Sequence, residues 1–189
     1  MPNTTPPKAV IFGCHGTTLT DAEKKFFAQQ NPVGFILFLR NCQSPAQVKG
    51  LTRQLREAVG RDDILILIDQ EGGKVVRLKP PHWREVPVAA KFAALAEHDM
   101  EAAKKAVYLN ARLIAHDLNE LGINVNCAPL ADIPAPGSHD VIGARAYGKT
   151  PEMVSMLASE MARGLLDGGV RHGGHRSVVG DTELGRNPW

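Results

Sequence analysis

The chain has 189 residues, of which 43% are hydrophobic and 22% are charged, as is ordinary for a soluble globular protein with a sizeable core. The net charge is +2 with acids and bases interspersed, which argues against a nucleic-acid partner. Three widely spaced cysteines predict reduced thiols and no metal site. No apolar run approaches the ~20 residues of a membrane span, and the prolines near the N-terminus do not fit a signal peptide. We therefore expect a cytoplasmic protein without membrane association.

The first part of the chain predicts strands alternating with helices. Short apolar runs predict strands at Ala9–Phe12, Val33–Leu39 and Ile64–Ile68. Thr20 and Glu23 have capping-box spacing, which predicts a helix through about Gln29. Ser44-Pro45 predicts the start of a second helix with one apolar stripe. The resulting βαβαβ order indicates an α/β fold with a parallel sheet.

The second part continues the alternation after a predicted loop over Leu78–Lys91. Trp83 in this loop either stacks on a sugar ring or anchors the loop to the body. A helix is predicted from about His98 to Leu121, followed by a strand at Ile123–Leu130. The alternating asparagines of that strand suit a barrel strand whose polar side faces the interior. Another helix is predicted to start at Thr150-Pro151, and no strand of useful length is expected after Val170.

A carboxylate, Asp69, directly follows the third predicted strand and precedes a tight turn containing two glycines. Ligands of α/β folds bind beyond the carboxyl ends of strands, and Arg77 is close enough in sequence to return there. Together these groups are suited to hold hydroxyls. The alternative is that Asp69 caps the turn while Arg77 pairs with Glu71 on the surface. A phosphate loop is disfavoured because Val75 follows Lys74 where that motif needs Ser or Thr.

Two further candidate residues lie beyond the fourth predicted strand. Asp132 follows that strand as Asp69 follows the third, and Arg145 lies in a second long loop as a candidate ligand donor.

In order and spacing, ILIDQEGGKVVRL, GINVNCAPLAD and VIGARAYG-x-x-P resemble glycoside hydrolase family 3. The match is to its bacterial β-N-acetylhexosaminidases of the peptidoglycan-recycling type, over about Ala9 to Val170.

The resemblance implies a TIM-like (β/α)8 barrel, of which this chain holds about the first four to five βα units. Residues 1–170 would form the partial barrel domain, and residues 171–189 a divergent tail. Such a partial barrel leaves open sheet edges, so we expect self-association through them. A TIM barrel typically needs ~250 residues, and we expect a deletion, a frame shift or a truncation to account for the tail.

The resemblance also implies roles for individual residues. Asp69 would accept hydrogen bonds from the hydroxyls of a terminal N-acetylglucosamine, and Arg77 and Arg145 would help to hold the sugar. Arg171 and His172 would stand for a lysine–histidine pair that binds substrate.

For the chemistry, one register places Asp181 and Glu183 where the family has the aspartate and histidine of its acid/base loop, and another leaves no counterpart. The family nucleophile is an aspartate expected beyond Trp189. The implied activity is retaining hydrolysis of β-linked N-acetylglucosamine from peptidoglycan fragments, without a cofactor. We expect this chain alone to be inactive. The alternative is a non-catalytic remnant that binds sugar.

Overall fold

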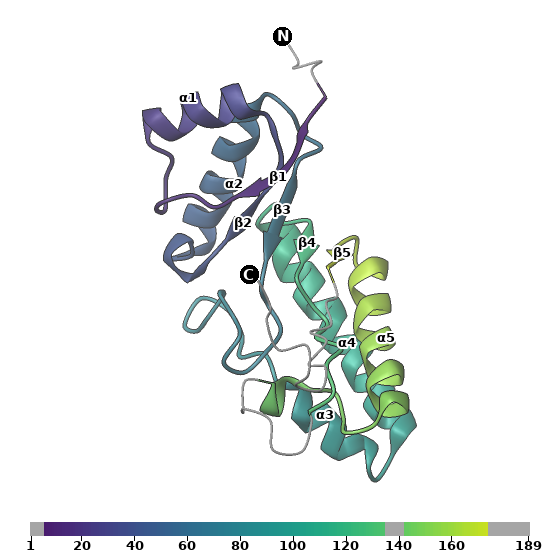
Figure 1. Cartoon of the computed structure of the whole chain (residues 1–189). Helices are drawn as coiled ribbons and strands as arrows, with labels where there is room; N and C mark the ends of the chain where they lie inside the picture. The colour runs from purple at the N-terminus through teal and green to yellow at the C-terminus, as the bar shows by residue number, and fades with distance from the viewer. Residues whose placement is uncertain (1–5, 135–141, 174–189) are drawn as a thin grey trace.

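A computed structural model describes residues 6–134 and 142–173 of the chain. Five parallel strands form one sheet in the order β1-β2-β3-β4-β5, which is also their order along the chain (Figure 1). They are β1 (Lys8–Phe12), β2 (Pro32–Leu37), β3 (Leu65–Ile68), β4 (Val125–Asn126) and β5 (Arg171–His172). Strands added always on the same side are typical of a barrel, whereas a doubly wound sheet reverses its order. The predicted α/β fold with a partial TIM-like barrel is confirmed.

Helices connect the strands as crossovers. They are α1 (Asp21–Gln30), α2 (Pro45–Val59), α3 (Ala89–Ala96), α4 (Met100–Glu120) and α5 (Pro151–Asp167), with short 3-10 turns η1 (Leu39–Asn41) and η2 (Gly143–Arg145). Figure 1 shows α1 and α2 beside β1 and β2, whereas α4 and α5 lie side by side next to β4 and β5. The core between helices and sheet contains fully buried side chains from both layers, including Phe35, Leu37, Leu55, Ile66 and Leu118.

Three helix starts agree with the predicted capping signals. The Thr20 hydroxyl accepts a hydrogen bond from the Glu23 amide (3.2 Å), and the Glu23 carboxylate accepts one from the Thr20 amide (2.9 Å). Ser44 and Thr150 cap α2 and α5 through their side chains, each with a proline in the first helical turn. These caps are local interactions, which explains why the sequence alone was sufficient to predict them.

The strand predicted at Ile123–Leu130 is wrong in length, because β4 contains two residues. Asn124, just before β4, and Asn126, within it, form side-chain hydrogen bonds with the backbone of the neighbouring segment. Asn124 accepts a hydrogen bond from the Ile66 amide (2.7 Å) and donates one to the Ile64 carbonyl (2.9 Å). Asn126 makes the same pair of contacts with the amide and carbonyl of Gln70, both at 3.0 Å. Side chains therefore extend the pairing between β3 and β4 at both ends.

Two other predictions are corrected. The predicted loop over Leu78–Lys91 ends earlier, because α3 begins at Ala89. No side chain caps this helix, so a capping motif could not predict where it starts. The expectation that no strand of useful length follows Val170 is corrected only in that a two-residue strand is present there. Arg171 and His172 form β5, held by hydrogen bonds from the Arg171 amide to the Asn124 carbonyl (2.9 Å) and from the Gly173 amide to the Asn126 carbonyl (2.8 Å).

Candidate functional site

The loop after β3 is folded back by the side chain of Gln70, which is 3% exposed. Its carbonyl oxygen accepts hydrogen bonds from the amides of Arg77 (2.9 Å) and Leu78 (3.1 Å), and its amide donates to the Leu78 carbonyl (3.1 Å). Asn126 in turn holds the Gln70 backbone from the neighbouring strand. One buried side chain thus closes the loop and returns Arg77 to the carboxyl end of β3.

The closed loop brings Asp69 and Arg77 into contact. Arg77 Nη2 donates to Asp69 Oδ2 at 2.7 Å, and the side chains of Arg77 and Asp69 are 23% and 21% exposed, respectively. Arg77 Nε is buried and has no hydrogen-bond partner within the portion of the chain that the structure describes. The predicted convergence of these two residues is confirmed. The alternative pairing of Arg77 with Glu71 is wrong, while the role of both residues in sugar binding stays a prediction.

Glu71 instead pairs with Arg145, from the loop after β4. Arg145 Nε donates to Glu71 Oε2 at 2.8 Å and Nη2 donates to Oε1 at 2.7 Å, a bidentate geometry. The Glu71 side chain is 9% exposed and that of Arg145 is 23% exposed. Hydrogen bonding to Glu71 raises the pKa of the Arg145 guanidinium. The sequence analysis missed the role of Glu71, because nothing in a local pattern connects two residues so far apart in the chain.

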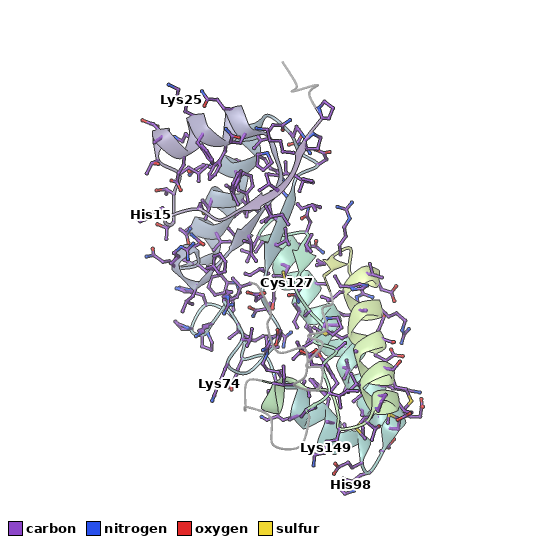
Figure 2. All side chains as sticks on the ribbon, in the orientation of Figure 1. His15, Lys25, Lys74, His98, Cys127 and Lys149 are labelled. Atoms are coloured by element: carbon purple, nitrogen blue, oxygen red, sulfur yellow. The ribbon has the colours of Figure 1, made fainter. Side chains whose placement is uncertain are left out.

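Two further groups border these ion pairs. Asp132 is 2% exposed, its charge acts on Arg145, and neither of its carboxylate oxygens has a hydrogen-bond partner among residues 6–134 and 142–173. Burial raises the pKa of the Cys127 thiol to about 11, and the nearby Asp69 carboxylate adds to this. Figure 2 shows Cys127 close to the ends of the strands. The ends of β3 and β4 therefore collect three carboxylates, two guanidinium groups and a protonated thiol.

Arg171 and His172, two further predicted site residues, are on β5, next to β4 in the sheet. Arg171 and His172 are exposed, and they pair with Val125 and Asn126, whose partners on β3 are Leu67 and Ile68. In the described part of the molecule, no hydrogen bond or ion pair joins their side chains to the two arginine–carboxylate pairs. Their predicted role in substrate binding stays a prediction. Asp181 and Glu183 lie outside the described residues.

The loop between β3 and α3 is attached to the core and to α4 by contacts that lie outside the ion pairs. Trp83 packs against the hydrophobic core, which agrees with its interpretation as an anchor of the loop. Arg84 donates to the Asn110 side chain (3.1 Å) and carbonyl (3.2 Å), which fastens the same loop to α4. Lys74 is exposed and projects from the loop (Figure 2). The loop geometry thus gives no support to phosphate binding through Lys74.

Two kinds of feature are absent from residues 6–134 and 142–173. No cluster of three or more His, Cys, Asp or Glu side chains there has an arrangement that could bind a metal ion. None of the helices in those same segments combines the length and the apolar character that crossing a membrane requires.

The sequence motifs at these strand ends can now be compared with known proteins. Residues 10–182 match the model of the glycosyl hydrolase family 3 N terminal domain. The chain belongs to glycosyl hydrolase family 3. Among family members it is similar to the β-hexosaminidase of Alkalilimnicola ehrlichii, with 35% identity over 186 residues, covering 95% of this chain and 53% of that protein.

Solved family 3 structures have the same fold. NagZ from Neisseria gonorrhoeae aligns with a TM-score of 0.84 at 30% identity, covering 91% of this chain and 50% of that one. A family 3 β-N-acetylglucosaminidase from Paenibacillus aligns with a TM-score of 0.76 at 37% identity, covering 86% and 30%. The chain spans about half the length of the curated relatives it matches. The described strands thus correspond to part of a family 3 barrel.

Proposed function

We propose that this chain supplies the sugar-holding part of a β-N-acetylhexosaminidase site that accepts a terminal β-linked N-acetylglucosamine. The observation that carries the proposal is the Asp69–Arg77 pair, fixed by Gln70 at the carboxyl end of β3. Asp69 is partly exposed and presents carboxylate oxygens as acceptors, while Arg77 and Arg145 present donors from the same rim. Acceptors beside donors suit the adjacent hydroxyls of a sugar ring.

The relatives support this choice of ligand. The Neisseria gonorrhoeae NagZ was also solved in complex with N-trifluoroacetyl-D-glucosamine, and that structure aligns with a TM-score of 0.82 at 30% identity, covering 90% of this chain and 50% of that one. The Paenibacillus relative is itself a β-N-acetylglucosaminidase. We extend the proposal to peptidoglycan fragments as the natural source of the sugar and to the cytoplasm as the location. Edge strands β1 and β5 are the surfaces through which the chain would self-associate.

We infer a second, narrower function for the 189-residue chain, which is sugar binding without cleavage. Retaining hydrolysis needs an anionic nucleophile and a proton donor on opposite sides of the scissile bond. Of the carboxylates found at the ends of β3 and β4, Asp69 and Glu71 are each held by an arginine and Asp132 is buried. We therefore assign none of these three as the nucleophile. In the proposed enzyme, the nucleophile and the acid/base would come from other parts of the barrel.

The binding proposal predicts the effect of Asp69→Ala. Removing a charged hydrogen-bond acceptor should weaken N-acetylglucosamine binding about tenfold or more, because such a bond contributes about 1.5–3 kcal/mol. The measurement is an NMR titration of the labelled chain with N-acetylglucosamine. Asp63→Ala is the matched control, since Asp63 lies at the opposite end of β3 and pairs with Arg61 at the surface. Equal affinities of the parent and Asp69→Ala would remove Asp69 from the site.

A cleavage assay distinguishes a hydrolase from a chain that only binds the sugar. We expect the purified 189-residue chain to release no product from an aryl β-N-acetylglucosaminide above the rate in buffer, because its strand-end carboxylates are engaged or buried. The assay follows release of the aryl group, and Asp69→Ala serves as the control for contaminating enzymes. Turnover by the parent that disappears in Asp69→Ala would show that the chain is a working hydrolase.

A further inference from the structure

We propose that Glu71 is a positioning residue, whose carboxylate holds the Arg145 guanidinium in the orientation that receives the sugar. This inference rests on the proposed function and concerns how its site is assembled. It assigns a role to a residue that the pattern of the sequence did not single out. Glu71 lies two residues after Asp69, so one short turn carries both the carboxylate proposed to face the ligand and the carboxylate that orients a donor.

The geometry of the pair suits this role. Both Glu71 oxygens accept from Arg145, Oε2 from Nε at 2.8 Å and Oε1 from Nη2 at 2.7 Å. Two parallel hydrogen bonds fix the plane and the direction of a guanidinium group, which a single contact does not. By contrast, a single contact joins Arg77 to Asp69. Arg145 lies in the 3-10 turn η2 of a long loop, where the bidentate contact restricts the orientation of its guanidinium group.

Glu71 is itself anchored and shielded. Its amide donates to the Val75 carbonyl at 2.9 Å, within the turn that follows β3. Its side chain is 9% exposed, whereas those of Asp69 and Arg145 are 21% and 23% exposed. Tyr147 is buried and borders the same small cavity as Glu71, and its phenol pKa is raised by burial and by the charge of Glu71. Glu71 is therefore more buried than Asp69 and Arg145, and in this proposal it acts on a ligand through Arg145.

A second carboxylate, that of Asp132, competes with Glu71 for the Arg145 guanidinium. Asp132 acts electrostatically on Arg145, and neither of its oxygens accepts a hydrogen bond within the described ranges. A buried carboxylate without partners attracts a nearby guanidinium strongly. Without the Glu71 carboxylate, Arg145 would be drawn towards Asp132 and away from its present place. The bidentate pair with Glu71 thus holds Arg145 against the attraction of Asp132 and Asp69, whose charges also act on it.

The test compares Glu71→Gln with the parent chain, labelled with nitrogen-15. The Nε–H signal of Arg145, assigned by its loss in Arg145→Lys, should exchange with water at least about tenfold faster in Glu71→Gln, since glutamine cannot accept both bonds. The dissociation constant for N-acetylglucosamine should rise about tenfold in the same variant. In an Arg145→Met background, Glu71→Gln should cause no further loss of affinity, because Glu71 acts through Arg145.

Controls separate this role from a merely structural one. Glu101→Gln removes an exposed ion pair with Lys104 on α4 and should leave both readouts unchanged. Unchanged Arg145 exchange in Glu71→Gln would overturn the inference, whatever the change in stability. If Glu71→Gln does not fold, Glu71→Asp decides: its shorter carboxylate should give faster Arg145 exchange than the parent, and parental exchange would overturn the inference. If the parent binds no N-acetylglucosamine, the proposed function fails, while Arg145 exchange still decides the role of Glu71.

Discussion

Replacing Gly72 by alanine should lower the free energy of unfolding by about 3 kcal/mol or more and abolish N-acetylglucosamine binding. Gly72 has a φ of +134°, and an added Cβ would lie 2.1 Å from the Pro87 carbonyl oxygen. Backbone, not a movable side chain, occupies that space. The turn would have to open, and it carries Glu71 on one side and leads to Arg77 on the other. Both ion pairs of the site would lose their geometry together.

Urea unfolding followed by circular dichroism measures the loss of stability, and the NMR titration measures binding. Gly16→Ala is the matched control, because Gly16 also lies in a loop after a strand and its added Cβ would meet nothing within 4 Å. It should change stability by about 0.5 kcal/mol at most, as exposed substitutions do. If Gly72→Ala were as stable as Gly16→Ala, the close approach of this turn to Pro87 would be disproved.

Alkaline pH should destabilise the chain steeply. Burial raises the pKa of Cys14 to about 11 and that of Cys42 to about 12, with the charges of Glu23 and Cys14, respectively, as further causes. A thiol of the unfolded chain ionises near pH 9, so above that pH the unfolded state binds fewer protons than the folded state. The free energy of unfolding therefore falls as pH rises from about 9 to 11, by up to about 1.4 kcal/mol per pH unit for each thiol. The stabilisation is complete below pH 9 and is lost through the folded pKa values.

The measurement is a series of urea unfolding curves between pH 7 and 11 under reducing conditions. Cys14→Ala/Cys42→Ala removes the two buried thiols and should flatten the dependence above pH 9, although the variant starts from a lower stability. Cys127 is half-buried, with a pKa also raised to about 11, and retains part of the slope. An identical slope in the parent and the double variant would contradict the assignment to these thiols.

Local patterns determined most of the framework of this protein. The Thr20, Ser44 and Thr150 caps specified where three helices begin, because a cap involves residues within one turn of one another. The apolar run before Asp69 specified β3, and the alternation of strands and helices specified the parallel sheet. The approach of Arg77 to Asp69 was predictable because eight residues and two glycines separate them. These are short-range effects that tertiary contacts reinforce without reversing.

The tertiary structure alone determined which side chains of the site pair with one another. The pairing of Glu71 with Arg145 spans 74 residues, and no spacing rule distinguishes it from the pairing of Glu71 with Arg77. Likewise, Asn124 and Asn126 alternate as strand residues do, yet their amides replace backbone hydrogen bonds because β3 lies beside them. A carboxylate or amide side chain takes whichever partner the fold brings within about 3 Å, and that choice depends on which strands become neighbours.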